Sequence, residues 1–185
     1  MTGFILTLVA VLLSGLGARD QLTMASLTRN LGPRPAALIV GILVCCATAF
    51  FAGYAAVLIA PLLTAPARLF LAALALGLAG IEALLLSPGR DARESTHSLG
   101  ALSAVLLANQ LTDAARFLIF GVALAADARM PAVLGGALGG MLLLTAAWAA
   151  PEAFTWQRLR WIRRALGLLM LILAVWLGLH VIGST

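Results

Sequence analysis

Two polar interruptions break an otherwise almost continuous apolar sequence. They read GLGARDQL at residues 15–22 and ANQLTDAAR at residues 108–116. Ionisable side chains are costly inside a bilayer and persist mainly where they pair with one another or line a pathway. The interruptions therefore supply the candidate residues of an ion or solute pathway: Arg19, Asp20, Gln21, Asn109, Gln110, Asp113 and Arg116.

The composition places the chain in a membrane. Of the 185 residues 63% are hydrophobic and only 10% are charged, and the mean hydropathy is +1.08. Such a chain has too little polar surface for a soluble globule, and its long apolar runs suit helices of roughly 20 residues better than barrel strands. We expect an all-α integral membrane protein with six transmembrane helices, at about residues 3–16, 35–60, 69–86, 98–126 (broken within the second interruption), 131 onward and 165–182.

The sequence divides into two similar halves. GLGARDQL aligns with QLTDAARF, which begins at Gln110, and RPAAL aligns with MPAVL, which begins at Met130. The predicted units are a first three-helix repeat at residues 1–87, a linker at 88–97 and a second three-helix repeat at 98–185. Because each repeat has an odd number of spans, the second enters the membrane upside down. Inverted repeats place a substrate site near the midplane, where broken or polar helices meet, so this architecture favours a transporter.

Arginine supplies all twelve basic residues, and their positions predict the orientation of the chain. Nine follow the first, third and fifth expected spans, and three lie on the other side. By the positive-inside rule the first group is cytoplasmic and both termini are outside. The abundance of Ala, Leu and Arg without Lys indicates a bacterial gene, hence an inner membrane. Because Arg19 and Asp20 rather than a small-residue cleavage site follow the first apolar run, we expect no cleaved signal peptide.

These motifs resemble those of the Gdt family of small manganese and calcium cation/proton antiporters, in the LysE-type transporter superfamily. The family motif reads Glu-x-Gly-Asp-(Lys/Arg)-(Ser/Thr) and occurs once in each half. In the first half Gly17 and Arg19 match it, Gly15 and Ala18 replace its acidic residues, and Asp20 stands at its hydroxyl position. The resemblance covers nearly the whole chain in span order. It implies a six-helix inverted-repeat antiporter that exchanges Mn²⁺ or Ca²⁺ for protons.

The second motif and the total charge leave the substrate open. Gln110 takes the Glu position and Asp113 matches the Asp, but alanines replace the basic and hydroxyl residues. Two intact family motifs would carry a net charge of about minus two, which suits one hard dication. Here Asp20 and Asp113 face Arg19 and Arg116, and the charges sum to zero. A dication in this low-dielectric region would lack a compensating charge.

Three functions follow from this count. In the first, the protein still exchanges Mn²⁺ or Ca²⁺, with Asp113, Gln110 and Asp20 as metal ligands. Asn109 and Glu82 would be further oxygen donors. Asn109, Gln110 and Asp113 share one helix face. In the second, the protein exports a small charged organic solute. In the third, it is a non-transporting accessory or scaffold subunit whose buried ion pairs hold the two halves together.

Other motifs narrow the function further. No phosphate-binding loop, paired metal-binding histidines or Ser/His/Asp set is present in the sequence, so we expect neither an enzyme nor a tightly bound cofactor. The glycines of LGGALGG at residues 134–140 recur at four-residue spacing, which predicts close helix packing inside the bundle and leaves a homodimer contact open. The expected partners are the lipid bilayer and a second copy or another membrane protein, and not nucleic acid.

Overall fold

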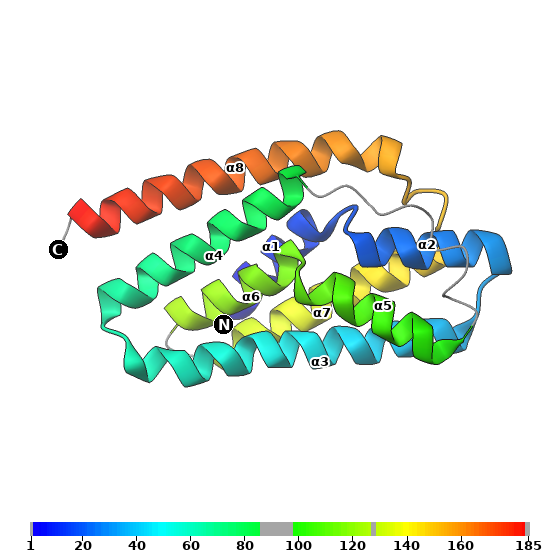
Figure 1. The fold of residues 1–185 in the computed structure, drawn as a ribbon, viewed down its shortest axis with the longest axis horizontal. Helices are drawn as coiled ribbons and strands as arrows, with labels where there is room; N and C mark the ends of the chain where they lie inside the picture. The colour runs from blue at the N-terminus through cyan, green and yellow to red at the C-terminus, as the bar shows by residue number, and fades with distance from the viewer. Residues whose placement is uncertain (1, 86–97, 127–128, 184–185) are drawn as a thin grey trace.

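The fold is a bundle of helices, as the composition predicts. The computed structural model describes residues 2–85, 98–126 and 129–183, and within these ranges it contains helices and no strand. The elements in chain order (Figure 1) are α1 (Thr2–Gly15), α2 (Arg19–Leu31), α3 (Pro35–Ile59), the 3-10 turn η1 (Ala60–Leu62), α4 (Ala65–Leu85), α5 (Leu99–Leu111), α6 (Ala114–Ala125), α7 (Arg129–Ala149) and α8 (Trp156–Gly183).

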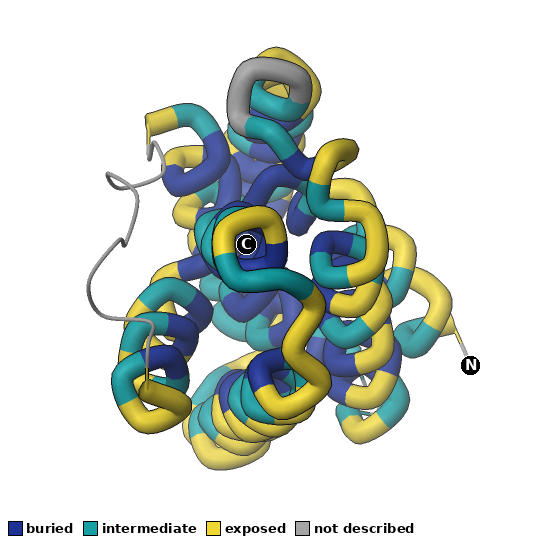
Figure 2. The backbone as a smooth tube through the Cα atoms, turned by 90° about the vertical axis from the view of Figure 1, so that its right-hand side faces the viewer, coloured by how far each residue is buried: buried dark blue, intermediate teal, exposed yellow. Residues whose placement is uncertain are grey.

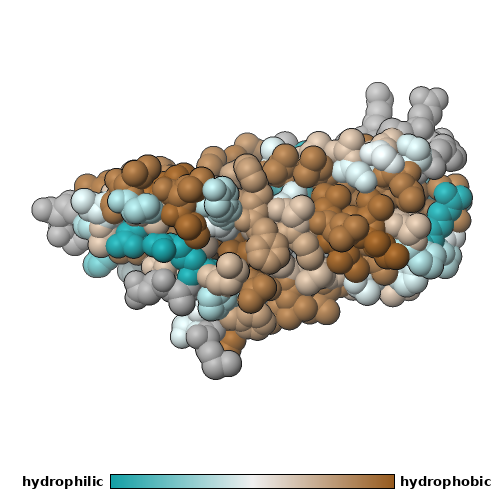
Figure 3. All heavy atoms as spheres, turned by 90° about the horizontal axis from the view of Figure 1, so that it is seen from below, coloured by the Kyte–Doolittle hydropathy of each residue, from teal (hydrophilic) through white to brown (hydrophobic). Residues whose placement is uncertain are grey.

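The helices account for between four and six membrane spans. Within the described ranges α3 with its 3-10 extension, α4, α7 and α8 are each long and apolar enough to cross a membrane. The remaining helices form two bent pairs, α1 with α2 at 59° and α5 with α6 at 53°, and each pair passes the same test as one interrupted span. On the face seen in Figure 3, hydrophobic residues cover a broad central region and hydrophilic residues gather toward the two ends. The chain is therefore a multi-pass membrane protein.

The first apolar helix ends close to its prediction, but a second helix follows it that the sequence does not predict. Helix α1 ends at Gly15, where the prediction is near residue 16, and α2 begins at Arg19 after a bend. Gly17 makes the turn with a φ of +76°, a region that favours glycine, and its amide donates to Oε1 of Gln21. The α2 segment has low hydropathy, but it buries an inward face that includes Met24 and Thr28. Amphipathic burial, rather than overall apolarity, therefore keeps α2 in the bundle.

The second break lies where the sequence predicts it. Helix α5 ends at Leu111, and Asp113 begins α6 as its N-cap, with the carboxylate accepting from the amide of Ala115. At the other end of α5, the hydroxyl of Ser98 accepts from the amide of Ala101. Each bent pair is thus divided near its middle, since α1 and α2 have 14 and 13 residues and α5 and α6 have 13 and 12.

Helix α7 lies inside the bundle, against α1, α2, α3 and α6. Its glycines allow this: a Cβ added to Gly135 would lie 2.2 Å from the carbonyl oxygen of Phe4 on α1, and one added to Gly139 would lie 3.2 Å from that of Leu8. The glycine motif therefore packs inside the protein, as predicted. Each helix turns a buried face inward and an exposed face outward (Figure 2). The exposed faces are largely apolar, as expected against lipid.

The last helix is longer than predicted. The sequence predicts a span at residues 165–182 after a basic loop, but α8 begins at Trp156 and includes the basic stretch. Helix α8 packs mainly along α4, where a Cβ on Gly80 would lie 2.8 Å from the carbonyl oxygen of Gly167. The predicted linker at residues 88–97 falls outside the described residues.

Candidate functional site

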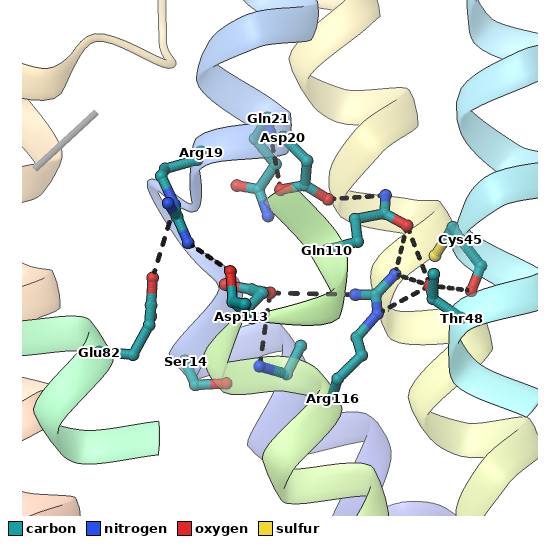
Figure 4. Close-up of polar contacts among 12 residues, drawn as sticks. Ser14, Arg19, Asp20, Gln21, Cys45, Thr48, Glu82, Gln110, Asp113 and Arg116 are labelled. Atoms are coloured by element: carbon teal, nitrogen blue, oxygen red, sulfur yellow. Dashed lines mark hydrogen bonds and ion pairs between the residues drawn. The ribbon is translucent and has the colours of Figure 1, made fainter. Parts of the chain in front are cut away.

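The two helix breaks meet in the structure, although they lie far apart in the sequence. Nη2 of Arg19, at the start of α2, donates to Oγ1 of Thr112 over 2.8 Å. Nε2 of Gln110, near the end of α5, donates to Oδ2 of Asp20 over 2.9 Å. The close-up shows these side chains converging from the two bent pairs (Figure 4). The two polar interruptions therefore form one cluster.

One side of the cluster centres on Arg116. Its Nε and Nη2 donate to Oγ1 of Thr48 on α3, over 3.0 and 2.8 Å, and Nη2 also donates to Oε1 of Gln110 over 2.7 Å. Nη1 lies 3.9 Å from Oδ2 of Asp113. Arg116 is only 5% exposed. Arg116 belongs to α6 and its buried guanidinium bonds residues of α3 and α5, so it fixes the relative position of the three helices.

The other side centres on Arg163, which extends inward from α8. Its Nη2 is hydrogen-bonded and ion-paired to Oε2 of Glu82 on α4, and lies 3.6 Å from Oδ1 of Asp113. Its Nη1 donates to the carbonyl oxygen of Ser14, near the end of α1, over 3.4 Å. Arg19 approaches the same carboxylate, with Nε 4.0 Å from Oε1 of Glu82. Arg163 and Glu82 are 1% and 4% exposed, so both are buried.

The cluster is electrically neutral and larger than the sequence predicts. Counted as ionised groups, it holds three carboxylates and three guanidiniums: Asp20, Glu82, Asp113, Arg19, Arg116 and Arg163. The two polar interruptions of the sequence predict two of each sign. Mutual neutralisation is what allows so many charges to be buried, because an isolated charge would be far too costly there.

The remaining predicted residues lie at the edge of this cluster. Gln21 supports the first turn through its bond with Gly17. Asn109 is half-buried, and its Nδ2 donates to Oγ1 of Thr23 over 3.5 Å, away from the carboxylates. The structure thus gathers all seven predicted pathway residues, with Gln21 and Asn109 outside the ion-pair network.

Two of the three predicted metal ligands, Asp20 and Gln110, are hydrogen-bonded to each other, and the third, Asp113, is linked to them only through its ion pair with Arg116. Oε1 of Gln110 accepts from Arg116, and the two oxygens of Asp20 accept from Gln110 and from the amide of Gln21. Asp113 lies beyond Arg116, so a guanidinium stands between it and Gln110. Among the described residues no three His, Cys, Asp or Glu side chains lie close enough together to hold a metal ion. The oxygens of Asp20 and Gln110 face N–H donors instead of a common centre.

Arg163 is a site residue that is not predicted from the sequence. Its place in a basic stretch predicts a residue that sets orientation, but the structure buries it in the polar cluster. A signal was present: the buried face of α8 includes Gly167, Met170 and Ala174, and Arg163 continues this series one turn earlier. Arg163 can be assigned to this buried face only if the helix begins before residue 163. The basic composition of the stretch is typical of a loop and does not indicate such an early start.

The buried side chains of this cluster can bind charged groups. The cluster offers guanidiniums to an anion, carboxylates to a cation, and two helix breaks whose neighbouring backbone can rearrange. No family model, curated protein or solved structure matches the chain. The function must therefore be argued from the geometry of the polar cluster itself.

Proposed function

We propose that this protein is a membrane transporter whose solute passes between the two bent helix pairs. The observation that carries the proposal is the meeting of the two breaks in one buried cluster, through the contacts of Arg19 with Thr112 and of Gln110 with Asp20. Breaks in spanning helices free backbone groups inside the membrane and are tolerated where they are buried in protein or line a polar cavity. In transporters such breaks form the substrate site.

The order of the elements supports an inverted repeat. Each half has a bent pair followed by two long helices: α1/α2, α3 and α4 in the first, and α5/α6, α7 and α8 in the second. The contacts are exchanged between halves, because α3 packs on α5 and α6 while α7 packs on α1 and α2. Inversion of the second half relative to the first follows if each bent pair is one span. The same architecture underlies the proposed relation to the Gdt family.

The charge balance favours a small charged organic solute, such as an amino acid. A cluster with net charge zero has no excess of carboxylates for a dication, whereas a solute with one or two charged groups can exchange partners with the ion pairs already there. An apolar cavity of about 330 Å³ between α3, α4 and α6 reaches Thr48 and Arg116. It gives the polar cluster a neighbouring space that a solute would need.

Exchange of Mn²⁺ or Ca²⁺ for protons is the second candidate. It is favoured by Asp113, whose Oδ1 has no hydrogen-bond partner among the described residues and belongs to the best-matched acidic position of the family motif. A bound dication would require one of the guanidiniums to move away. The arginine distribution supports a bacterial inner membrane with both termini outside, and a homodimer or another membrane partner is compatible with the apolar outer faces.

Flux into proteoliposomes tests the proposal. The native chain, Asp113→Asn and the exposed-site control Glu152→Gln are assayed with labelled amino acids of each charge and with Mn²⁺ and Ca²⁺. Asn can still cap α6, so Asp113→Asn should fold but lose at least about tenfold in flux because a buried charge is removed from the pathway. The control should match the native chain. If the folded native protein moves none of these solutes, the transport proposal fails and the scaffold hypothesis remains.

A further inference from the structure

Arg163 carries the charge that α8 contributes to the polar centre, beside apolar contacts of Leu159 with Gly17 and of Met170 with the start of α6. Helix α8 lies along α4 at the edge of the bundle and has few contacts with α1 (Figure 1). Arg163 nevertheless reaches Ser14 on α1, Glu82 on α4 and Asp113 at the second break. The polar centre is thus closed on this side by one guanidinium.

The oxygens around this guanidinium are not all satisfied. Oγ of Ser14, Oε1 of Glu82 and Oδ1 of Asp113 have no hydrogen-bond partner among the described residues. The three residues are only 1%, 4% and 4% exposed. Buried acceptors without a donor cost free energy. The carboxylate oxygens have only long ion-pair contacts, with Nε of Arg19 4.0 Å from Oε1 of Glu82 and Nη2 of Arg163 3.6 Å from Oδ1 of Asp113. This position therefore has more acceptor capacity than the two guanidiniums fill.

There is also room beside this position. A cavity of about 770 Å³ lies between α8 and helices α1, α4 and α6. Its lining includes Leu13, next to Ser14, and Leu166, one turn from Arg163. Displacement of Arg163 would uncover the carboxylates. The lining of this space is almost wholly apolar, so it can take the methylene stem of the side chain, while the guanidinium must keep a polar partner.

We propose that Arg163 is a tethered cation that occupies the solute site, and that this site takes a small organic monocation with a guanidinium or ammonium group. The inference rests on the proposed transport function and deepens it. The site already binds a guanidinium, so a solute that displaces Arg163 must bring the same single charge and N–H donors. A dication would leave one uncompensated positive charge. An alkali ion has the same single charge and is coordinated by oxygens directly, so sodium is the control that separates charge alone from N–H donation.

Chemical rescue of Arg163→Ala tests the site directly. The variant leaves the cluster with three carboxylates and two guanidiniums, and a space for the missing group. Guanidinium or methylammonium chloride, at low millimolar concentration, should restore its thermal stability with saturation. At about ten times the dissociation constant the expected rise in Tm is about 3 to 6 °C. Sodium chloride at the same ionic strength should not have this effect.

Two variants serve as controls. Arg164→Ala removes the neighbouring guanidinium of α8, which is exposed and lies over Trp161, so the probes should not alter its stability. In Arg163→Ala combined with Glu82→Gln the net charge is again zero, and the guanidinium effect should disappear. Equal stabilisation of the Arg163 and Arg164 variants, or persistence of the effect in the double variant, would overturn the proposal.

Removal of Arg163 can also prevent folding, and the yield of folded protein then becomes the measurement. Arg163→Ala is synthesised in a cell-free system with nanodiscs, in the presence of guanidinium, methylammonium or sodium. A monodisperse product with the organic cations but not with sodium supports the site, and failure with all three refutes it. Rescue and flux are measured independently. Rescue without transport would support the cation site and reject the proposed transport function. Transport without rescue would support the transport function and reject the cation site.

Discussion

Replacement of Arg116 by methionine should destabilise the protein more than any single surface change. Arg116 makes three hydrogen bonds, two to Thr48 and one to Gln110, and an ion pair with Asp113. Methionine fills a similar volume but removes these three donated hydrogen bonds, leaving Gln110 only the hydroxyl of Thr48 as a donor to Oε1, and gives the cluster a net charge of minus one. Breaking a buried pair by removing one partner typically costs about 3 to 5 kcal/mol.

The cost should fall when charge balance is restored. In Arg116→Met combined with Asp113→Asn, two carboxylates and two guanidiniums remain in the cluster, so its net charge returns to zero. Replacing both members of a buried pair costs much less than removing one. We therefore expect the double variant to be more stable than Arg116→Met alone by at least about 1 kcal/mol, since interacting residues deviate from additivity by roughly this amount or more.

Thermal or denaturant unfolding in detergent, followed by tryptophan fluorescence and circular dichroism, measures both effects. Arg34→Met is the matched control, because Arg34 is exposed at the start of α3, and it should change the stability by less than about 0.5 kcal/mol. If Arg116→Met were as stable as this control, or if the two substitutions destabilised additively, the neutral ion-pair network would not be what holds the two breaks together.

Two further substitutions test the backbone approaches that bring the cluster together. Gly135→Ala should destabilise the protein by about 1 to 3 kcal/mol through overpacking against Phe4. The control Gly100→Ala, in open space on α5, should be neutral or slightly stabilising in the same unfolding measurement. Equal effects of the two substitutions would contradict the close approach of α7 to α1. Gly17→Ala should lower the free energy of unfolding by about 1 to 2 kcal/mol because an L-residue is strained at its φ of +76°. Amide hydrogen exchange should increase first at the start of α2. Unchanged protection of these amides would contradict a turn that depends on Gly17.

Much of the architecture follows from local features of the sequence. Apolar runs of spanning length predict the positions of α3, α4 and α7 to within a few residues. The break at Asp113 follows from a polar interruption with a capping residue. The glycines at residues 135–140 predict close packing because their spacing puts them in pairs on one helix face. These features depend on neighbours within a few turns of helix, which the sequence displays directly.

The ends of the bent and terminal helices depend on partners far away in the chain. Helix α2 is too polar to be recognised as part of a span, and it is held by burial of residues such as Met24 against the rest of the bundle. The first turns of α8 resemble a basic loop because four arginines lie between residues 158 and 164. Tertiary contacts decide which of these arginines faces inward, and hence that Arg163 is buried while Arg164 is exposed.

The sequence by itself determined that the chain is a helical membrane protein with two polar interruptions, because bilayer energetics act on composition and on runs of residues. It also selected the side chains of those interruptions as the candidates for function. Only the tertiary structure decided that both interruptions share one cluster, that Glu82 and Arg163 complete it, and that its charges balance. Charge pairing acts through space, so residues separated by most of the chain can neutralise one another only once the helices between them have packed.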